Sequence, residues 1–199
     1  MVCHHLYLLT AMVREWYPDR KVIAVCHGSD LRQIEKNPLE REYIKQQIPK
    51  LDSIIALHKE QRKEIERIFD AEEEKIVVAG VGYNDQIFFQ KSNQTHRSSL
   101  KKRRVIFAGK ISEKKGVLSL LRALSYLSYP EDELEVVFAG GHGPEEEYQR
   151  IRKLAEACRY PVKFLGMLSQ IELAEEFRKS DVFVLPSFFE GLALVNIEA

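Results

Sequence analysis

The fold is decided by the stretch Asp181-Val-Phe-Val-Leu-Pro-Ser-Phe-Phe-Glu-Gly-Leu-Ala-Leu-Val-Asn-Ile-Glu198. Its apolar start, residues 181–185, predicts a buried strand. A loop containing Glu190 and Gly191 follows, and a helix that begins after Gly191 is expected to carry Glu198. Open α/β sheets bind ligands at the carboxyl ends of their strands. The stretch therefore predicts both a parallel sheet and a ligand site at its edge.

The same rhythm of strand, glycine turn and helix runs through the second half of the chain. A capping-box pattern, Ser169-Gln-Ile-Glu172, opens one helix. Another is expected to begin at Pro144, where a helix tolerates proline. The remaining expected elements are strands at 104–108, 134–139 and 162–165 and a helix at 117–127. Such alternation is typical of βαβ units with right-handed crossovers.

The first half carries a less regular version of this pattern. We expect strands at 21–26, 53–57 and 75–79, and helices at 5–16, 38–47 and 60–69. The segment 90–104 is polar and has no apolar period. We therefore predict an α/β protein with two doubly wound, Rossmann-like parallel-sheet domains, over residues 1–90 and 104–199, joined by a linker at 91–103.

Composition narrows the class of protein. Lys plus Arg and Asp plus Glu both number 30, so the net charge is zero and no general field attracts nucleic acid or anionic membranes. No basic leader and no apolar run of about 18 residues is present. The odd, widely spaced Cys3, Cys26 and Cys158 predict free thiols in a reducing cytoplasm. His4-His5 lacks a second ligand pair, so we expect no metal site.

Glycine and lysine recur at the expected strand ends. Gly109-Lys110, Lys115-Gly116 and the turn Gly140-Gly141-His142-Gly143 should gather along one edge of the second sheet. Glycines allow close backbone approach, and lysines add positive charge, which together suit a diphosphate. Tight turns beside solvated lysines are the alternative, since no Walker-type loop is present. Spacing alone leaves both interpretations open.

Glu190 and Glu198 bracket the expected helix start. Their separation along the axis, up to about 12 Å, is too great for a retaining glycosidase pair, which needs about 5 Å. An elongated ligand with hydroxyls at both ends and a diphosphate between them, such as a sugar nucleotide, fits this arrangement. The alternative is an exposed loop glutamate and a helix-surface glutamate with no shared role.

Several ordered motifs resemble those of the GT-B glycosyltransferases, in particular glycosyltransferase family 4. Residues 183–199 resemble the family's Glu-x7-Glu segment, and 107–116 resemble its Gly-Arg…Lys-Gly stretch. Similar matches are found at 25–31 (Val-Cys-His-Gly-Ser-Asp-Leu), 77–88, 140–144 and 164–166. The resemblance implies two GT-B domains, both incomplete, because two full domains need roughly 300 residues. It also implies that the chain is truncated at both ends.

The resemblance implies a role for each matching residue. His27 would face the donor sugar and acceptor across the interdomain cleft, and Glu190 would contact the donor sugar at its reacting end. Glu198 would hold the ribose hydroxyls. The remaining donor-binding positions are Gly109, Lys110, Lys115, Gly141 and the backbone at Ala193, Leu194 and Val195. Lys110 replaces the commoner arginine, and Ala193 replaces a glycine.

The implied activity is retaining, metal-independent transfer of a sugar from a UDP- or GDP-sugar, with no resident cofactor. The acceptor would be a glycan, a lipid or a small molecule. Peripheral contact of the full-length protein with a membrane is compatible with this activity. A non-catalytic remnant with weak nucleotide-sugar binding is the alternative. A dinucleotide-dependent oxidoreductase is disfavoured because no strand is followed by G-x-G-x-x-G.

Overall fold

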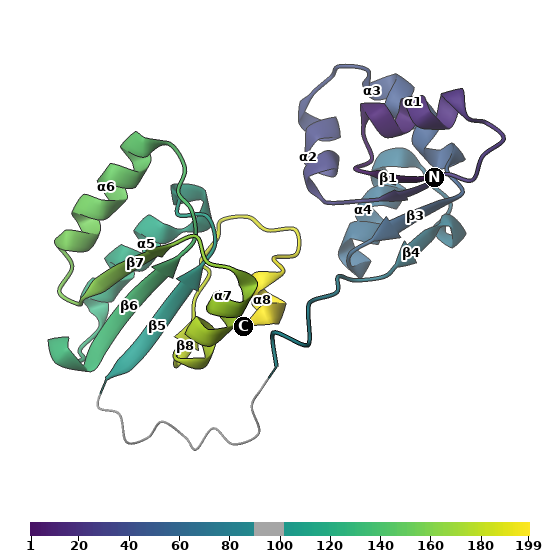
Figure 1. Ribbon diagram of the computed structural model, residues 1–199. Coiled ribbons are helices and arrows are strands. Elements are labelled where there is room, and N and C mark those ends of the chain that lie inside the picture. The colour runs from purple at the N-terminus through teal and green to yellow at the C-terminus, as the bar shows by residue number, and fades with distance from the viewer. Residues whose placement is uncertain (90–101) are drawn as a thin grey trace. The chain divides into compact units, whose positions relative to one another are not determined.

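The structure, a computed structural model, describes residues 1–89 and 102–199 (Figure 1). Contacts divide the chain into two compact units, Met1–Gly82 and Tyr83–Ala199. Each unit holds one four-stranded parallel sheet. The first unit ends before residue 90, where the sequence places the domain boundary. Most of the predicted linker, 91–103, lies outside the described residues.

The first sheet has its strands in sequence order. These are β1 (Val2–His4), β2 (Ile23–Val25), β3 (Ser53–Ala56) and β4 (Ile76–Val78). The helices of this unit are α1 (Leu8–Trp16), α2 (Ser29–Lys36), α3 (Arg41–Gln47) and α4 (Lys59–Phe69), with 3-10 turns at Ile48–Lys50 and Glu73–Lys75. Right-handed crossovers that always step in the same direction place their helices on one face of a sheet. The unit therefore has a single core cluster.

The two faces of the first sheet differ in burial. Ala24 and Ile54 are neighbours on the covered face and are 0% and 1% exposed. On the opposite face, Val2 is 66% exposed and Val77 is 51% exposed. Side chains alternate between the faces of a strand, so one side of this sheet is mainly apolar and partly exposed to water.

Four features of the first unit differ from the sequence predictions. The strand β1 and the helix α2 were not predicted, and α1 begins at Leu8 instead of residue 5. The helix expected from residue 38 begins at Arg41, because Glu40 has a left-handed backbone with φ 52° that interrupts a helix. The other strands and α4 lie within one or two residues of their predicted positions.

The second sheet has the strand order β7-β6-β5-β8. Its strands are β5 (Arg103–Ala108), β6 (Leu134–Ala139), β7 (Val162–Gly166) and β8 (Val182–Phe183). After β5 the chain steps outward twice on one side, and then crosses to the other side of β5 to form β8. The order therefore reverses between β5 and β8. Such a reversal is the topological switch point at which open α/β sheets bind ligands.

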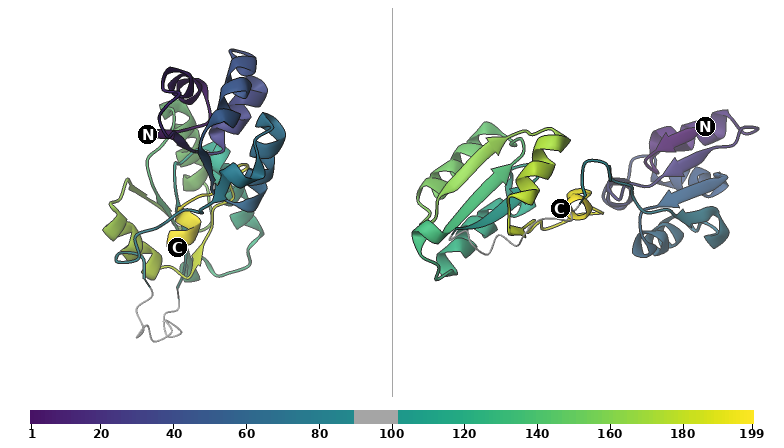
Figure 2. Two further views of the ribbon diagram at one scale, coloured as in Figure 1. Left: turned by 90° about the vertical axis from the view of Figure 1, so that its right-hand side faces the viewer. Right: turned by 60° about the horizontal axis from the view of Figure 1, so that its bottom comes forward.

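Helices cover both faces of the second sheet (Figure 2). On one face, α5 (Val117–Ala123) and α6 (Glu145–Glu156) pack against Phe107 and Phe138. On the other, α7 (Gln170–Arg178) and α8 (Val195–Glu198) pack against Ile106 and Ala108. Consecutive residues of β5 thus face opposite layers, as expected for a strand buried on both sides.

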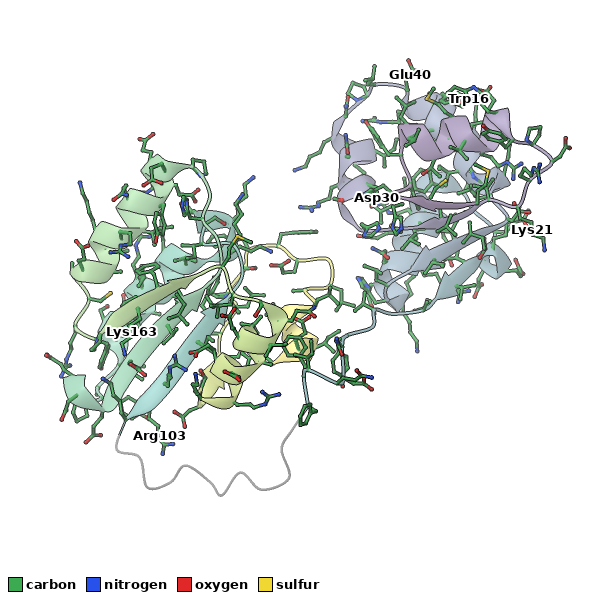
Figure 3. All side chains as sticks on the ribbon, in the orientation of Figure 1. Trp16, Lys21, Asp30, Glu40, Arg103 and Lys163 are labelled. Carbon is green, nitrogen blue, oxygen red and sulfur yellow. The ribbon has the colours of Figure 1, made fainter. Side chains whose placement is uncertain are left out.

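Local signals in the second unit match the elements that form. Ser169 and Glu172 make the predicted capping box at the start of α7. Pro144 is the N-cap of α6, one residue before the helix. The helix predicted to reach residue 127 is α-helical only to Ala123 and continues as a 3-10 turn over Leu124–Tyr126. Further 3-10 turns lie at Glu113–Lys115 and Glu131–Glu133. Figure 3 shows the side chains, with Arg103 labelled at the start of β5.

Candidate functional site

Two glycine turns meet at the carboxyl edge of the second sheet. The amide of Gly109 donates to the carbonyl of Ala139 at 2.9 Å, and the amide of Gly140 donates to the carbonyl of Gly166 at 2.7 Å. Gly140 has φ 138°, and a Cβ atom there would lie 2.0 Å from the carbonyl oxygen of Gly109. Only glycine fits this position, so the backbone itself forms the edge.

A cavity of about 250 Å³ opens beside these turns. It brings together four residues that the sequence assigned to donor binding, Gly109, Gly141, Val195 and Glu198. The remaining lining is mainly apolar, from Ala108, Ala139, Gly140, Met167, Leu168 and Leu173. Glu198 is the acidic group in this wall, and burial raises the pKa of its carboxyl. The cavity therefore combines an apolar lining with one hydrogen-bonding carboxyl group.

Lys115 and Glu190 form an ion pair. Lys115 ends the 3-10 turn before α5, and Glu190 lies in the loop after β8, so the pair joins the two strands that flank the switch point. The hydroxyl of Ser187 also donates to Glu190 at 2.6 Å. The two charged side chains are 31% and 24% exposed, so a ligand in solvent can reach them.

The backbone of the same loops is packed closely. A Cβ atom at Gly116 would lie 1.9 Å from the carbonyl oxygen of Pro186, and Gly116 has φ 73°. The amide of Phe188 donates to the carbonyl of Lys114 at 3.2 Å. The loop after β8 is thus held against the turn before α5 by backbone contacts as well as by the ion pair.

Lys110 lies in a different part of this edge. Its side chain is exposed, and its Cε atom lies 3.7 Å from the position of a Cβ on Gly143. His142 of the same turn stacks on Tyr148, with ring centroids 4.2 Å apart. The structure therefore places Lys110 beside the 140–143 turn and Lys115 beside the loop after β8.

The helix that carries Glu198 is shorter than predicted. It begins at Val195, whereas the sequence placed its start directly after Gly191. Leu194 is its N-cap, and Ala193 lies outside it. The expected helix start directly after Gly191 is thus wrong, because the loop after β8 extends three residues further, to Leu194.

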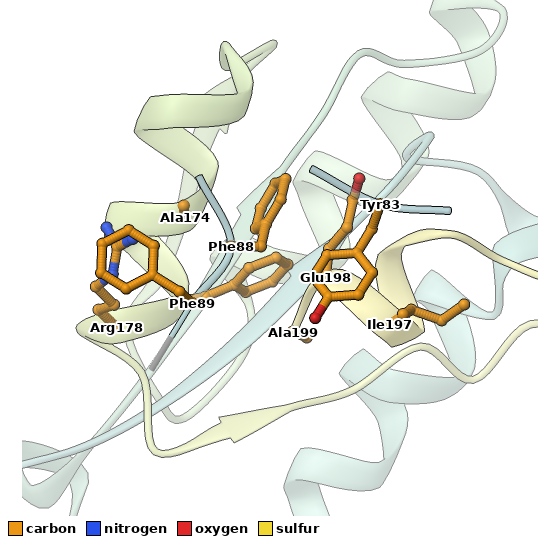
Figure 4. Close-up of a pocket in the computed structure, with 9 residues that line it drawn as sticks. Tyr83, Phe88, Phe89, Ala174, Arg178, Ile197, Glu198 and Ala199 are labelled. Carbon is orange, nitrogen blue, oxygen red and sulfur yellow. The ribbon is translucent and has the colours of Figure 1, made fainter. Parts of the chain in front are cut away.

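A second cavity, of about 460 Å³, lies beside Glu198 (Figure 4). Tyr83, Phe88, Phe89, Ala174, Phe177, Arg178, Ile197, Glu198 and Ala199 line it. Arg178 donates to the carbonyl of Ile87 at 2.6 Å and lies over the Phe89 ring at 5.0 Å. Phe88 is 6% exposed, and its ring lies 6.3 Å from that of Phe177. Residues 83–89 therefore pack as part of the second unit, which the sequence did not indicate.

His27, the predicted residue of the first unit, follows β2 and contacts two other histidines. Its Nε2 atom lies 2.9 Å from Nδ1 of His4, and its ring centroid lies 4.4 Å from that of His5. Burial lowers the pKa of His27, and the neighbouring His5 and His4 lower it further, whereas Asp30 raises it. From the sequence, His4 and His5 were considered only as metal ligands, so their contact with His27 was not predicted.

Three further findings concern the described part of the chain. Cys3, Cys26 and Cys158 are free thiols, as predicted. Within residues 1–89 and 102–199, no group of three His, Cys, Asp or Glu side chains is arranged to hold a metal ion. Over the same residues, none of the helices has the length and apolar character needed to cross a bilayer.

Known proteins match this chain over much of its length. The D-inositol 3-phosphate glycosyltransferase of Xylanimonas cellulosilytica is 29% identical over 160 residues, covering 74% of this chain and 38% of the relative. The protein of the same name from Streptomyces scabiei is 31% identical over 161 residues, covering 74% and 36%. The chain thus spans less than half the length of these curated relatives.

Solved structures share the fold. Anabaena Alr3699/HepE, in complex with UDP and glucose, has a TM-score of 0.71 at 15% identity and covers 95% of this chain and 52% of that one. WaaG, a glycosyltransferase involved in lipopolysaccharide biosynthesis, has a TM-score of 0.63 at 17% identity, covering 94% and 59%. These likenesses confirm the predicted fold, with two Rossmann-like parallel sheets of the GT-B type. The family profile of Glycosyl transferases group 1 matches residues 88–199, more than half of the chain. The chain belongs to this family.

Proposed function

We propose that this chain is the nucleotide-sugar-binding portion of a glycosyltransferase. The observation that carries the proposal is the cavity at the switch point of the second sheet. It gathers Gly109, Gly141, Val195 and Glu198, residues that lie far apart in the sequence. The Lys115–Glu190 ion pair lies at the carboxyl edge of the same sheet. A donor with a ribose, a diphosphate and a sugar matches this combination of groups.

Each group has a distinct part in this proposal. Glu198 accepts hydrogen bonds from the ribose hydroxyls, and the glycine turns let backbone amides approach the diphosphate. Lys115 and Lys110 supply positive charge to the phosphates. Glu190 meets the donor sugar. HepE, a structural neighbour, is described in complex with UDP and glucose, which supports a UDP-sugar as the donor class.

The chemistry follows from where charge develops. When the bond from the sugar's anomeric carbon to the diphosphate breaks, negative charge builds on the leaving phosphate. Fixed cations and amide dipoles stabilise that charge. Because lysines supply it, we propose that transfer needs neither a divalent metal nor a resident cofactor, and that it retains the anomeric configuration, as the family resemblance implies. The acceptor hydroxyl oxygen forms the new bond to the same carbon, and its proton goes to the oxygen of the leaving diphosphate.

The names of the curated relatives support one acceptor class. Both act, by name, on D-inositol 3-phosphate, so we propose a small phosphate-bearing polyol ahead of a glycan or a lipid. Free thiols are typical of proteins in a reducing compartment, and all three cysteines are free. We therefore propose a cytoplasmic location. Peripheral membrane contact in the full-length protein belongs to the lipid-acceptor alternative.

Calorimetry with UDP-glucose and GDP-mannose, in EDTA, tests donor binding. Lys115→Ala should weaken the free energy of donor binding by about 1.5–3 kcal/mol, roughly a tenfold to hundredfold loss of affinity, because a charge-assisted contact to phosphate is removed. Lys114→Ala is the matched control. The Lys114 side chain is exposed, and the hydrogen bond to Phe188 uses the backbone carbonyl of Lys114, which alanine keeps. Equal donor binding by the wild type and Lys115→Ala would contradict the proposal.

Binding without turnover is the second candidate, because the chain spans less than half of its relatives. An assay for release of UDP from UDP-glucose, with inositol phosphate present, separates the two. Turnover by the 199-residue chain supports the enzyme, and donor binding with no release of UDP supports the binding module.

A further inference from the structure

Three imidazole rings meet at the carboxyl edge of the first sheet. β1 ends at His4, which is in register with Val25 of β2, so the residues after these strands emerge side by side. Nδ1 of His4 lies 2.9 Å from Nε2 of His27, and the ring centroids are 5.2 Å apart. The His5 ring lies closer still, with its centroid 4.4 Å from that of His27. All three residues are exposed to solvent.

The backbone beneath this cluster is fixed. Asp30 is 1% exposed, and its carboxylate accepts the amide of Leu6 at 2.6 Å and the amide of His27 at 3.2 Å. It therefore ties the loop after β1 to the loop after β2. The amide of His5 donates to Val25 at 2.9 Å, and its carbonyl accepts the hydroxyl of Thr10 at 2.6 Å.

His5 has an unusual backbone conformation. Its φ is 71°, in the left-handed region that non-glycine residues rarely adopt. Such conformations persist only where surrounding contacts determine them, and they cluster at functional sites. This conformation, held by the hydrogen bonds above, places the His5 ring against His27.

The hydrogen bond between two imidazoles links their protonation. A neutral imidazole has one N–H and one acceptor nitrogen. One of the two facing nitrogens must therefore carry hydrogen while the other lacks it, so the tautomer of His4 determines that of His27. A pair in which both rings are charged would turn two N–H groups toward each other.

We propose that His4 and His5 are positioning residues that set the orientation and tautomer of the His27 ring. The proposal concerns the His27 ring itself; any part of His27 in sugar transfer rests on the proposed function. With Nε2 engaged by His4, His27 offers its Nδ1 side to a ligand. The charges that face the ring are those of His4, His5 and Asp30, and the two histidines lower the pKa of His27 while the carboxylate raises it.

Long-range ¹⁵N–¹H NMR of the whole 199-residue chain tests this arrangement, because it reports the tautomer and titration of each imidazole. His4→Ala should change the tautomer ratio of His27 and raise its pKa, since a neighbouring positive charge is lost. His4→Asn should restore a hydrogen bond to Nε2 of His27 but not the wild-type tautomer ratio, because the amide can present either its oxygen or its NH2 group. His5→Ala should raise the pKa of His27 as well.

His58→Asn is the matched control. His58 also follows a strand of the first unit, but its Nδ1 caps α4 by accepting the amide of Gln61, which asparagine can do as well. This variant should leave the His27 signals unchanged. Identical His27 tautomers and titration in the wild type and His4→Ala would overturn the proposal. UDP binding on the same samples separates the two hypotheses: its absence from the wild type would remove the proposed function and not the imidazole arrangement.

Discussion

Lys115 and Glu190, 75 residues apart in the sequence, form an ion pair across the switch point of the second sheet. The pair exists because β5 and β8 are neighbours, which brings the turn before α5 against the loop after β8. A cation proposed to hold phosphate is thus already held by a carboxylate. A diphosphate that enters must compete with Glu190 for Lys115.

Glu190→Gln is expected to tighten the binding of UDP, because the substitution removes both the competing carboxylate and its repulsion of phosphate. The gain should be about 1 kcal/mol, since the pair is partly exposed and surface ion pairs contribute 0–1 kcal/mol. Calorimetry with UDP measures it. UDP-glucose should gain less, since Glu190 is proposed to contact the sugar. Weaker UDP binding by this variant would show that Glu190 orders Lys115 for the phosphate and does not compete for it.

Donor binding should depend on pH through Glu198. Burial raises the pKa of this carboxyl, so protonation begins at a higher pH than for an ordinary glutamate. As the pH falls through this raised pKa, the wild type should lose affinity for UDP-glucose, because an ionised carboxylate accepts hydrogen bonds from ribose hydroxyls better than a neutral acid does. The diphosphate of UDP-glucose stays ionised over the same range. Glu198→Gln should bind weakly and with little pH dependence.

The control for this experiment is Glu175→Gln, which changes an exposed glutamate of α7 and should behave as the wild type. A pH dependence that survives in Glu198→Gln would assign the effect to another group.

Alanine substitutions at two glycines with nearly the same φ angle should distinguish backbone strain from steric clash. Gly116 has φ 73°, and Gly166 has φ 71°. A Cβ atom at Gly116 would clash with the backbone of Pro186, whereas a Cβ atom at Gly166 would have nothing within 4 Å. Gly166→Ala should cost about 1 kcal/mol of unfolding free energy from backbone strain. Gly116→Ala should cost about 1–3 kcal/mol more from the clash.

Urea unfolding of the two glycine variants, followed by circular dichroism, gives this difference. Equal losses would mean that the loop after β8 moves away from Gly116 without cost. Gly82→Ala, with open space and an ordinary φ, is the reference and should change the unfolding free energy by less than about 1 kcal/mol.

The thiols should react in order of exposure. Cys26 is fully buried, and burial together with Asp30 raises its pKa, so it should resist Ellman's reagent until the first unit unfolds. Cys3 and Cys158 are partly exposed and should react first. Above about pH 8.5, the unfolded chain releases a thiol proton that folded Cys26 retains, so stability should fall as the pH rises. Cys26→Ala should flatten that decline, and fast labelling of Cys26 in the folded chain would contradict its burial.

Most of the second unit could be predicted because its local signals agree. The Ser169–Glu172 capping box, the apolar strands and the glycine turns all indicate the same βαβ succession, and the structure forms it. The start of α8 could not be predicted, because nothing between Gly191 and Val195 marks a cap and the loop is held by the distant Gly116 turn.

The first unit was harder to interpret. β1 is only three residues long and includes His4, so it lacks a strand's apolar signature. α2 follows a left-handed Gly28, and only its first three residues, 29–31, lie in the motif noted at 25–31. The contact of His27 with His4 depends on the β1–β2 register, which a single sequence does not specify. Side chains that meet through strand neighbours are thus less predictable than those that meet along a helix.

The open face of the first sheet has a physical consequence for the chain in solution. The side chains of Val2 and Val77 are exposed to water on the face that also carries the partly buried Val25 and Ile55. Each Å² of this hydrocarbon removed from water would release about 25 cal/mol. A molecule that covered that side of the folded sheet and did not bind the unfolded chain would therefore raise the melting temperature of the first unit.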